Sequence, residues 1–204
     1  MSEHFDANLL LDDIKREFNA NLDEVMPIEV GFKRLDESAI IPTKAHASDS
    51  GFDLYALKNT IIEPGETAVV PTGIAVKLPS GYEAQVRPRS GVTTKTKLRV
   101  QLGTIDNEFR GELGVIVDNV FDEPINFSTG AWTMLKLAET IDGDVINTEE
   151  KTGLGSYLIR KGDRVAQLVV QPLPPAQAYE IKGDMDSTSR GGKGFGSTGV
   201  RNTL

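Results

Sequence analysis

Apolar and polar side chains alternate on both sides of a turn in the stretch Ile74-Ala75-Val76-Lys77-Leu78-Pro79-Ser80-Gly81-Tyr82-Glu83-Ala84-Gln85-Val86-Arg87. A period of two places every second side chain on the same face of a β-strand. The Pro-Ser-Gly sequence in the middle is typical of a turn. The stretch therefore predicts two half-buried strands joined by a short connection.

The same period recurs outside this stretch, at residues 98–102 and 166–170. Turn-forming residues separate the segments, as at Glu63-Pro64-Gly65-Glu66 and Lys161-Gly162-Asp163. Helical segments do not alternate with these strands, which disfavours a parallel α/β sheet. We expect an all-β fold, namely an antiparallel sandwich, a jelly roll or a barrel.

Three segments depart from this pattern. Apolar residues step by three and four along residues 8–26, which predicts a helix within an N-terminal extension, residues 1–26. Polar residues surround an apolar stretch with Trp132 at about 122–154, and we interpret this segment as an insertion in a domain spanning residues 27–181. Residues 182–204 are dominated by Gly, Ser, Thr and charged residues, which predicts a mobile C-terminal arm.

Composition excludes several function classes. The 204 residues carry a net charge of -8, no cysteine and two histidines. The acidic balance disfavours a nucleic-acid or anionic membrane surface, and the lack of cysteine excludes thiolate chemistry and Cys-based zinc sites. No apolar run reaches the ~18 residues of a membrane span, and the N-terminal apolar run is too short for a signal peptide. We expect a cytoplasmic protein that binds neither nucleic acid nor membranes.

Two carboxylates are candidates for chemistry. Asp53 interrupts an apolar, strand-like run, which suggests a partner such as a metal-bound water. Asp106 lies in residues 103–112, where glycines flank an acidic, aromatic turn and a hairpin is predicted. It is a candidate general base, with Phe109 as a platform for a sugar or base. Capping of its own turn is the alternative role for Asp106.

Two segments are candidates for phosphate binding. Arg87-Pro88-Arg89-Ser90-Gly91 ends a strand and is either a phosphate cradle or an ordinary turn. In residues 190–199, glycines and hydroxyl side chains offer donors for an anion, and Phe195 offers a ring to stack on a base. A flexible tail is the alternative. Residues 194–199 formally match G-x-G-x-x-G, but too few residues follow for a βαβ unit, and no Walker pattern occurs.

Taken in order, five segments resemble the five motifs of the homotrimeric dUTPase family (deoxyuridine triphosphate nucleotidohydrolases). They are Ser50-Gly51-Phe52-Asp53-Leu54, Pro88-Arg89-Ser90-Gly91, Gly103 to Gly111, Gly162 to Leu168, and Arg190 to Gly199. Each motif alone is weak, but five in order, separated by the expected strands, are specific. The resemblance spans residues 28–199 apart from the insertion.

This resemblance implies a jelly roll that forms a homotrimer with active sites at the subunit interfaces. The implied reaction is the Mg²⁺-dependent hydrolysis of dUTP to dUMP and pyrophosphate. It limits uracil in DNA and supplies dUMP for thymidylate synthesis.

The resemblance also implies residue roles. Asp106 would deprotonate the water that attacks the α-phosphorus, and Asp53 would contact Mg²⁺ through a water. Phe109 would lie under the deoxyribose and Phe195 would stack on the uracil. The remaining implied substrate-binding residues are Arg89, Ser90, Gly91 and Gln167 for the phosphates, Gly103, Thr104 and Ile105 for the uracil edge, and Arg190, Gly196, Ser197 and Thr198 for the terminal phosphates.

Three departures accompany the resemblance. Phe109 replaces the usual tyrosine, Lys193 replaces a small residue, and the insertion lies between the third and fourth motifs. A comparable insertion occurs in dUTPases of some bacteriophages, which would place the protein in the host cytoplasm. Residues 122–154 would contact a protein partner, pack on their own subunit, or border the active site. The rival functions are a dCTP deaminase-type enzyme of the same fold and a nucleotide-sensing interaction module.

Overall fold

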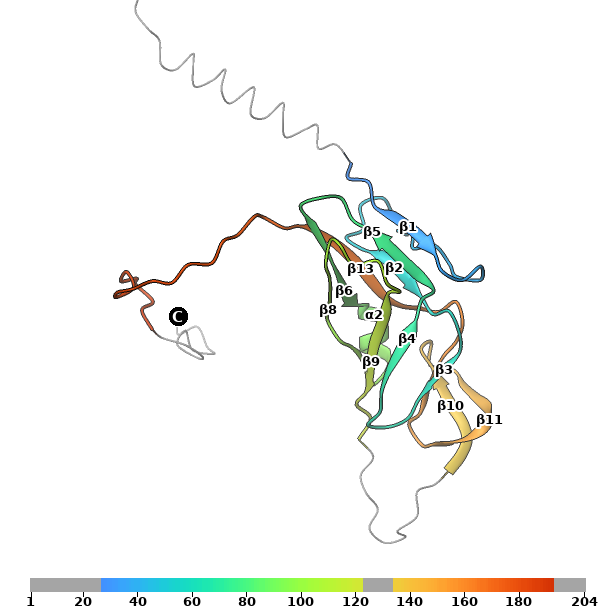
Figure 1. Ribbon diagram of the computed structural model, residues 1–204. Helices are drawn as coiled ribbons and strands as arrows, with labels where there is room; N and C mark the ends of the chain where they lie inside the picture. Colours follow the sequence, from blue (N-terminus) through green and yellow to red (C-terminus); the bar gives the residue numbers. More distant parts are fainter. Residues whose placement is uncertain (1–26, 123–133, 193–204) are drawn as a thin grey trace, which may run out of the picture. The chain divides into compact units, whose positions relative to one another are not determined.

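The computed structural model describes residues 27–122 and 134–192 (Figure 1). The predicted helix within residues 8–26, Trp132, Lys193 and the end of the arm lie outside the described residues. Almost all regular structure in the described part is β-strand, with one short helix. In chain order the elements are β1 (Gly31–Arg34), β2 (Phe52–Tyr55), β3 (Thr60–Ile62), β4 (Thr67–Pro71), β5 (Ile74–Lys77), β6 (Tyr82–Pro88), α2 (Ser90–Lys95), β7 (Leu98–Val100), β8 (Gly103–Ile105), β9 (Gly114–Asn119), β10 (Met134–Thr140), β11 (Val145–Gly153), β12 (Tyr157–Ile159) and β13 (Arg164–Pro172).

The strands form small sheets with the crossing connections of a jelly roll. The strand orders are β1-β5, β11-β10-β12-β3, β2-β13-β6-β8 and β4-β9-β7. Strands far apart in sequence are neighbours, as where β13 pairs with both β2 and β6. This arrangement confirms the predicted all-β, jelly-roll fold, since strands form the layers and the described part of the chain has one short helix.

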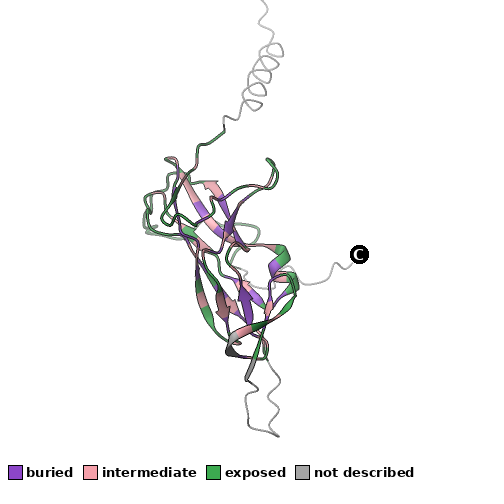
Figure 2. Cartoon of the chain, turned by 90° about the vertical axis from the view of Figure 1, so that its right-hand side faces the viewer, coloured by how far each residue is buried: buried purple, intermediate pink, exposed green. Residues whose placement is uncertain are grey.

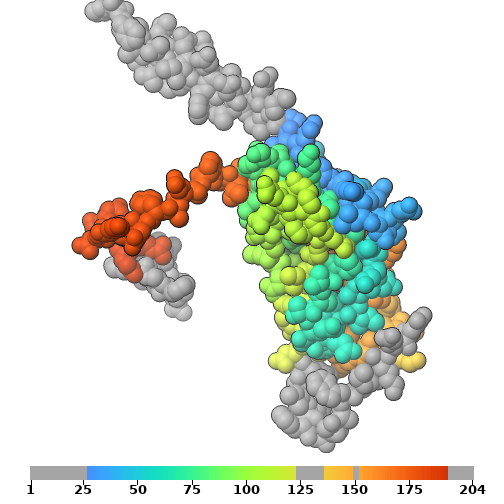
Figure 3. Space-filling model, in the orientation of Figure 1, coloured from blue at the N-terminus to red at the C-terminus, as the bar shows by residue number. Residues whose placement is uncertain are grey.

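A single apolar core lies between the sheets (Figure 2). The alternation of β6 accounts for its contribution, because Ala84 and Val86 are buried while Glu83, Gln85 and Arg87 are half-buried on the other face. On β4 and β9, Val70, Val115 and Val117 are buried in the same core. Their neighbours Val69 and Ile116 are register partners and face outward, 64% and 41% exposed. Figure 3 shows β4 and β9 side by side at the surface.

Two sequence predictions between β7 and β9 are wrong. The strand predicted over 98–102 ends at Val100, and Leu102 is 74% exposed, because Gln101 and Leu102 carry the chain from one sheet to another. The hairpin predicted at 103–112 is also absent from the described structure. Instead, β8 pairs with β6 and β9 pairs with β4 and β7, so the segment connects two sheets.

The described part of the insertion is integrated into the fold. β10 and β11 form an antiparallel hairpin, and β10 also pairs in parallel with β12, which pairs with β3. Ile141, in the turn of the hairpin, belongs to the main core. At the base of the insertion, the buried Asn119 donates through its amide to the carbonyls of Ile62 and Gly155. Packing on its own subunit is therefore one role of this segment.

The chain divides into two compact units, Met1–Leu173 and Pro174–Leu204. The division precedes the predicted start of the arm at residue 182. In the second unit, residues 174–192 are exposed and carry no helix or strand. Among the residues described, no helix is long and apolar enough to cross a membrane.

Candidate functional site

Neighbouring strands place Asp53 beside two arginines. Asp53 sits on β2 opposite Gln167 of β13, and its backbone N–H donates to the carbonyl of Thr43 at 2.8 Å. Its carboxylate is nearly buried, with Oδ1 3.0 Å from Arg89 Nε and Oδ2 3.3 Å from Arg164 Nη1. Arg89 Nη1 also donates to the carbonyl of Arg164 at 3.0 Å. The partner that an embedded carboxylate requires is thus a pair of guanidinium groups.

The backbone of Gly51 packs closely against the side chain of Gln167. A Cβ at Gly51 would lie 2.9 Å from Gln167 Oε1 and 3.0 Å from Gln167 Cβ, so a side chain at position 51 would displace Gln167. Gln167 Nε2 donates to the carbonyl of Pro88 at 3.0 Å, just before Arg89. The predicted residues Asp53, Arg89 and Gln167 therefore form one connected cluster.

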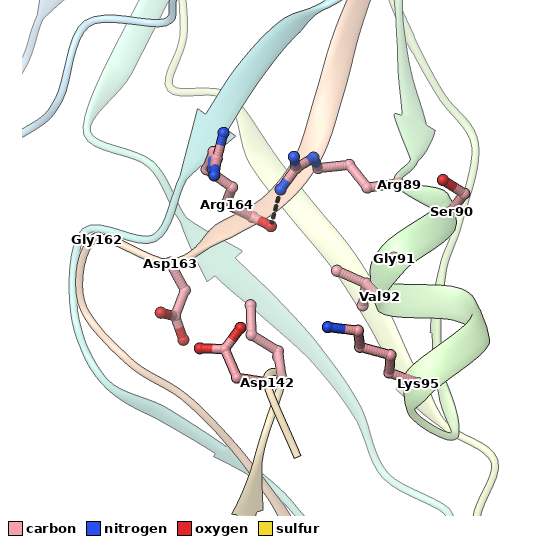
Figure 4. A pocket seen from close by; sticks show the side chains of 10 residues that line it. Arg89, Ser90, Gly91, Val92, Lys95, Asp142, Gly162, Asp163 and Arg164 are labelled. Atoms are coloured by element: carbon pink, nitrogen blue, oxygen red, sulfur yellow. Dashed lines mark hydrogen bonds between the residues drawn. The ribbon is translucent and has the colours of Figure 1, made fainter. Parts of the chain in front are cut away.

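This cluster borders a pocket of about 370 Å³ (Figure 4). Cationic Arg89, Lys95 and Arg164 line it together with the carboxylates Asp142 and Asp163. Figure 4 shows the Lys95 side chain reaching into the pocket from α2, toward the side where Asp142 and Asp163 stand. The other lining residues are Ser90, Gly91, Val92, Ile141 and Gly162.

Several of these lining residues were not predicted as site residues. Asp163 and Arg164 belong to the fourth motif but were given no role there. Lys95 was missed because the six-residue helix α2, which aims it into the pocket, is too short to produce a helical period. Ile141 and Asp142 were assigned only to the insertion, and their position shows that the insertion borders this pocket as well as packing on its own subunit.

The two carboxylates of the pocket are tied to Arg160. Asp142 Oδ2 lies 2.8 Å from Arg160 Nη2, and Asp163 Oδ2 accepts the backbone N–H of Arg160 at 2.7 Å. Burial raises the pKa of the Asp163 carboxyl, while the Arg160 N–H and its positive charge lower that pKa less strongly. The pocket therefore combines fixed cationic groups with one carboxylate that is costly to ionise.

The third-motif residues occupy another part of the same sheet. β8 holds Gly103, Thr104 and Ile105 against β6, with Ile105 opposite Ala84. The next residue, Asp106, is exposed and falls opposite position 83 if this register continues. Position 89 is six residues farther along β6, which corresponds to roughly 20 Å at the rise of a strand. Within one chain, Asp106 therefore lies apart from the pocket.

Phe109 stays close to Asp106 in the turn that follows β8. Its backbone N–H donates to the carbonyl of Asp106 at 3.1 Å, and its side chain is 42% exposed. A Cβ at Gly111 would lie 2.6 Å from Cζ of the ring, so the glycine makes room for the aromatic side chain.

Arg190 is exposed in the second compact unit. Phe195, Gly196, Ser197 and Thr198 lie outside the described residues.

The described residues alone do not form a metal cage. In the ranges 27–122 and 134–192, no three His, Cys, Asp or Glu residues cluster as metal ligands. The carboxylate of Asp53 forms ion pairs with Arg89 and Arg164. Such a donor set fits Mg²⁺ held mainly by substrate phosphates, with a protein carboxylate reaching it through water.

Comparison with known proteins gives a consistent result. The dUTPase family model matches residues 37–132. A deoxyuridine 5'-triphosphate nucleotidohydrolase of Gloeothece citriformis is 36% identical over 169 residues, 82% of this chain and 94% of the relative. One of Clostridioides difficile is also 36% identical over 169 residues, 82% of this chain and 95% of that protein.

Solved structures of phage dUTPases are similar as well. The Staphylococcus bacteriophage 80alpha dUTPase with dUpNHpp has a TM-score of 0.75 and 34% identity, covering 84% of this chain and 99% of that chain. The dUTPase from phage phi11 of S. aureus, solved with its species-specific insert visible, has a TM-score of 0.69 and 30% identity, covering 76% and 97%. A mutant phi11 dUTPase that coordinates a structural Mg(II) ion has a TM-score of 0.69 and 30% identity, covering 78% and 99%.

Proposed function

The chain belongs to the dUTPase family and is a dUTP diphosphatase, and from this premise we propose a Mg²⁺-dependent attack of water on the α-phosphorus of dUTP. The products are dUMP and pyrophosphate. The observation that carries the proposal is the pocket that Arg89, Lys95 and Arg164 line together with Ser90 and Gly91. Guanidinium and ammonium groups are suited to the oxygens of a triphosphate.

Each part of the proposed mechanism is assigned to a group of residues. Arg89, Ser90, Gly91 and Gln167 bind the phosphates, with Asp53 holding Arg89 in position. Asp106 accepts the proton of the attacking water. Mg²⁺, when bound, neutralises phosphate charge and makes the α-phosphorus more electrophilic. Asp53 is the carboxylate that would reach a metal-bound water.

The remaining assignments concern the nucleoside and the outer phosphates. Gly103, Thr104 and Ile105 contact the uracil edge and Phe109 lies under the sugar. On the arm, Arg190, Gly196, Ser197 and Thr198 close over the terminal phosphates, and Phe195 stacks on the base. In this proposal the arm acts as a lid that shields the attacking water and the triphosphate from bulk solvent.

We extend the proposal to a homotrimer with shared active sites. Two observations support it. Asp106 follows β8 near one end of β6 and Arg89 follows the other end of β6, a separation of roughly 20 Å at the rise of a strand, so in this proposal a second chain brings Asp106 to the pocket. In addition, the outward face of β4 and β9 presents the paired Val69 and Ile116 to solvent, and exposed apolar patches mark contact surfaces.

We also retain a protein-partner role for residues 122–154. Leu137, Val145 and Leu154 support it, because they are 38%, 67% and 47% exposed on the hairpin and its end. This interaction would be additional to catalysis.

A substrate comparison tests the main proposal. The protein is incubated with dUTP, dCTP, dTTP and UTP, with Mg²⁺ or with a chelator, and the products are separated. We expect dUMP and pyrophosphate from dUTP alone, and loss of turnover with the chelator. Deamination of dCTP would favour the rival enzyme, and binding of nucleotide without any turnover would favour the sensing module.

Replacement of the proposed base tests the mechanism. Asp106→Asn keeps the size of the side chain and removes the proton acceptor. We expect turnover to fall by ~10²–10⁴-fold, while affinity for a non-hydrolysable dUTP analogue is retained. Glu108→Gln, on the same exposed turn, is the matched control. Near-normal single-turnover hydrolysis by Asp106→Asn would refute the assignment.

A further inference from the structure

The side-chain amide of Asn107 hydrogen-bonds the turn that carries Asp106 to a neighbouring turn. Asn107 Nδ2 lies 2.5 Å from the carbonyl oxygen of Pro79, 3.2 Å from that of Tyr82 and 3.4 Å from that of Leu78. An amide nitrogen carries two donors and no acceptor. The side chain therefore faces a small cage of carbonyl oxygens between β5 and β6.

The rest of the Asp106 turn is bonded mainly to itself. Phe109 N–H donates to the carbonyl of Asp106 at 3.1 Å, and Arg110 Nη1 donates to the carbonyls of Asn107 and Phe109 at 2.6 and 2.8 Å. Among the described hydrogen bonds of residues 106–111, those of Asn107 are the ones that reach outside the turn. They fix the turn one residue after Asp106.

The cage that receives the amide is itself well anchored. The Leu173 N–H donates to the carbonyl of Gly81 at 2.7 Å, and Tyr82 pairs with Pro172 of β13. On the other side of Asp106, β8 pairs with β6 up to Ile105. Asp106 is thus held between a strand ladder and the Asn107 amide, with its own side chain exposed.

We propose that Asn107 is a positioning residue, which holds the Asp106 carboxylate in the geometry needed for proton abstraction. This inference rests on the proposed role of Asp106. A general base must be placed within hydrogen-bond reach of its proton, and a displacement of about 1 Å can cost ~10²-fold in rate. The Asn107 amide contacts carbonyls of Leu78, Pro79 and Tyr82, none of which is assigned to the substrate, so we expect its loss to affect turnover more than nucleotide affinity.

Asn107→Asp tests the proposal, because it is nearly isosteric and points carboxylate oxygens at the carbonyl cage. We expect single-turnover hydrolysis of dUTP to fall by ~10–100-fold, with the Kd of the non-hydrolysable analogue changed less than about threefold. Glu108→Gln, the next residue on the turn, is the control and should leave both values unchanged. Asn107→Ser, which keeps one shorter donor, serves as the second variant and should give an intermediate rate.

A double variant separates positioning from general damage. If Asn107 acts through Asp106, adding Asn107→Asp to Asp106→Asn should leave the residual single-turnover rate unchanged, because coupled residues are not additive. A further drop of the same size as in the wild-type background would overturn the proposal, as would normal turnover of Asn107→Asp or, if that variant does not fold, of Asn107→Ser. Normal turnover of Asp106→Asn alone would instead refute the proposed base.

Discussion

Asp163 is a pocket residue whose carboxyl has a raised pKa. Its effect on stability can be measured as a function of pH. Burial raises the pKa of Asp163 above its ordinary value near 3.8. The folded state therefore binds a proton at higher pH than the unfolded state, so this group favours folding more as the pH falls. At neutral pH the ionised Asp163 lowers the free energy of unfolding. This loss of stability disappears as the pH drops through the folded-state pKa, because the carboxyl then becomes protonated.

Asp163→Asn removes this titration while its amide oxygen still accepts the Arg160 N–H. At pH 7 we expect the variant to match or exceed the wild type in free energy of unfolding. As the pH falls toward 4, the wild type should gain on the variant. Denaturant unfolding across this range measures the difference, with Asp186→Asn in the exposed arm as the control. A stability difference that is independent of pH would contradict the expected titration.

Some single site residues could be predicted from the sequence, but the residues that contact them could not. Asp53 is recognisable because a carboxylate inside an apolar run needs compensation, and the structure supplies it. The identity of the second partner, Arg164, was not predictable, because strand register across β2 and β13 brings together residues more than a hundred positions apart. Nothing in the sequence indicated the positioning role proposed for Asn107, because that role depends on its contacts with carbonyl oxygens of another turn.

At the scale of elements, alternation predicted the strands that pack one face on the core. β5, β6 and β13 lie where the period of two placed them. Connections were less predictable: nothing in residues 101–112 indicates that the chain changes sheets there, because the same glycine and acidic residues suit a hairpin. The short helix α2 was not predicted, because its six residues make less than two turns and give no helical period.

The β10–β11 hairpin brings the negative charge of Asp142 to the pocket proposed to bind the phosphates, and Asp142→Asn tests its effect. Asp142 and Arg160 form an exposed ion pair, worth only about 0–1 kcal/mol, so stability should change little. Removal of the charge should tighten binding of the dUTP analogue a few-fold, with a larger effect at low salt. Titration calorimetry at two salt concentrations measures both.

The matched control is Asp144→Asn, two residues along the same turn and absent from the pocket lining. An equal effect of both substitutions would indicate net charge rather than position. Weaker binding by Asp142→Asn would show that the carboxylate, or the Arg160 it holds, supports the nucleotide.

At the scale of the whole molecule, the division of the proposed site sets the expected assembly. The proposed site draws on the pocket cluster and the Asp106 turn, which belong to the first compact unit, and on the arm, which belongs to the second. If each site takes these parts from different chains, an active protein must be a trimer, and light scattering should give three times the mass of the 22.2 kDa chain. A monomer mass for an active protein would contradict the shared-site proposal.

Mixed trimers give the stricter test. One chain carries Asp106→Asn and the other is truncated after Asp186, and each alone should be nearly inactive. Because residues 174–192 lie outside the first compact unit and are exposed, truncation should leave thermal stability almost unchanged. After the two are unfolded together and refolded, some sites should receive an intact Asp106 turn from one chain and an intact arm from the other, which restores part of the turnover. Homotypic refolding of each variant is the control. If every site took both parts from a single chain, no mixture would regain activity, and the sharing of sites between subunits would have to be abandoned.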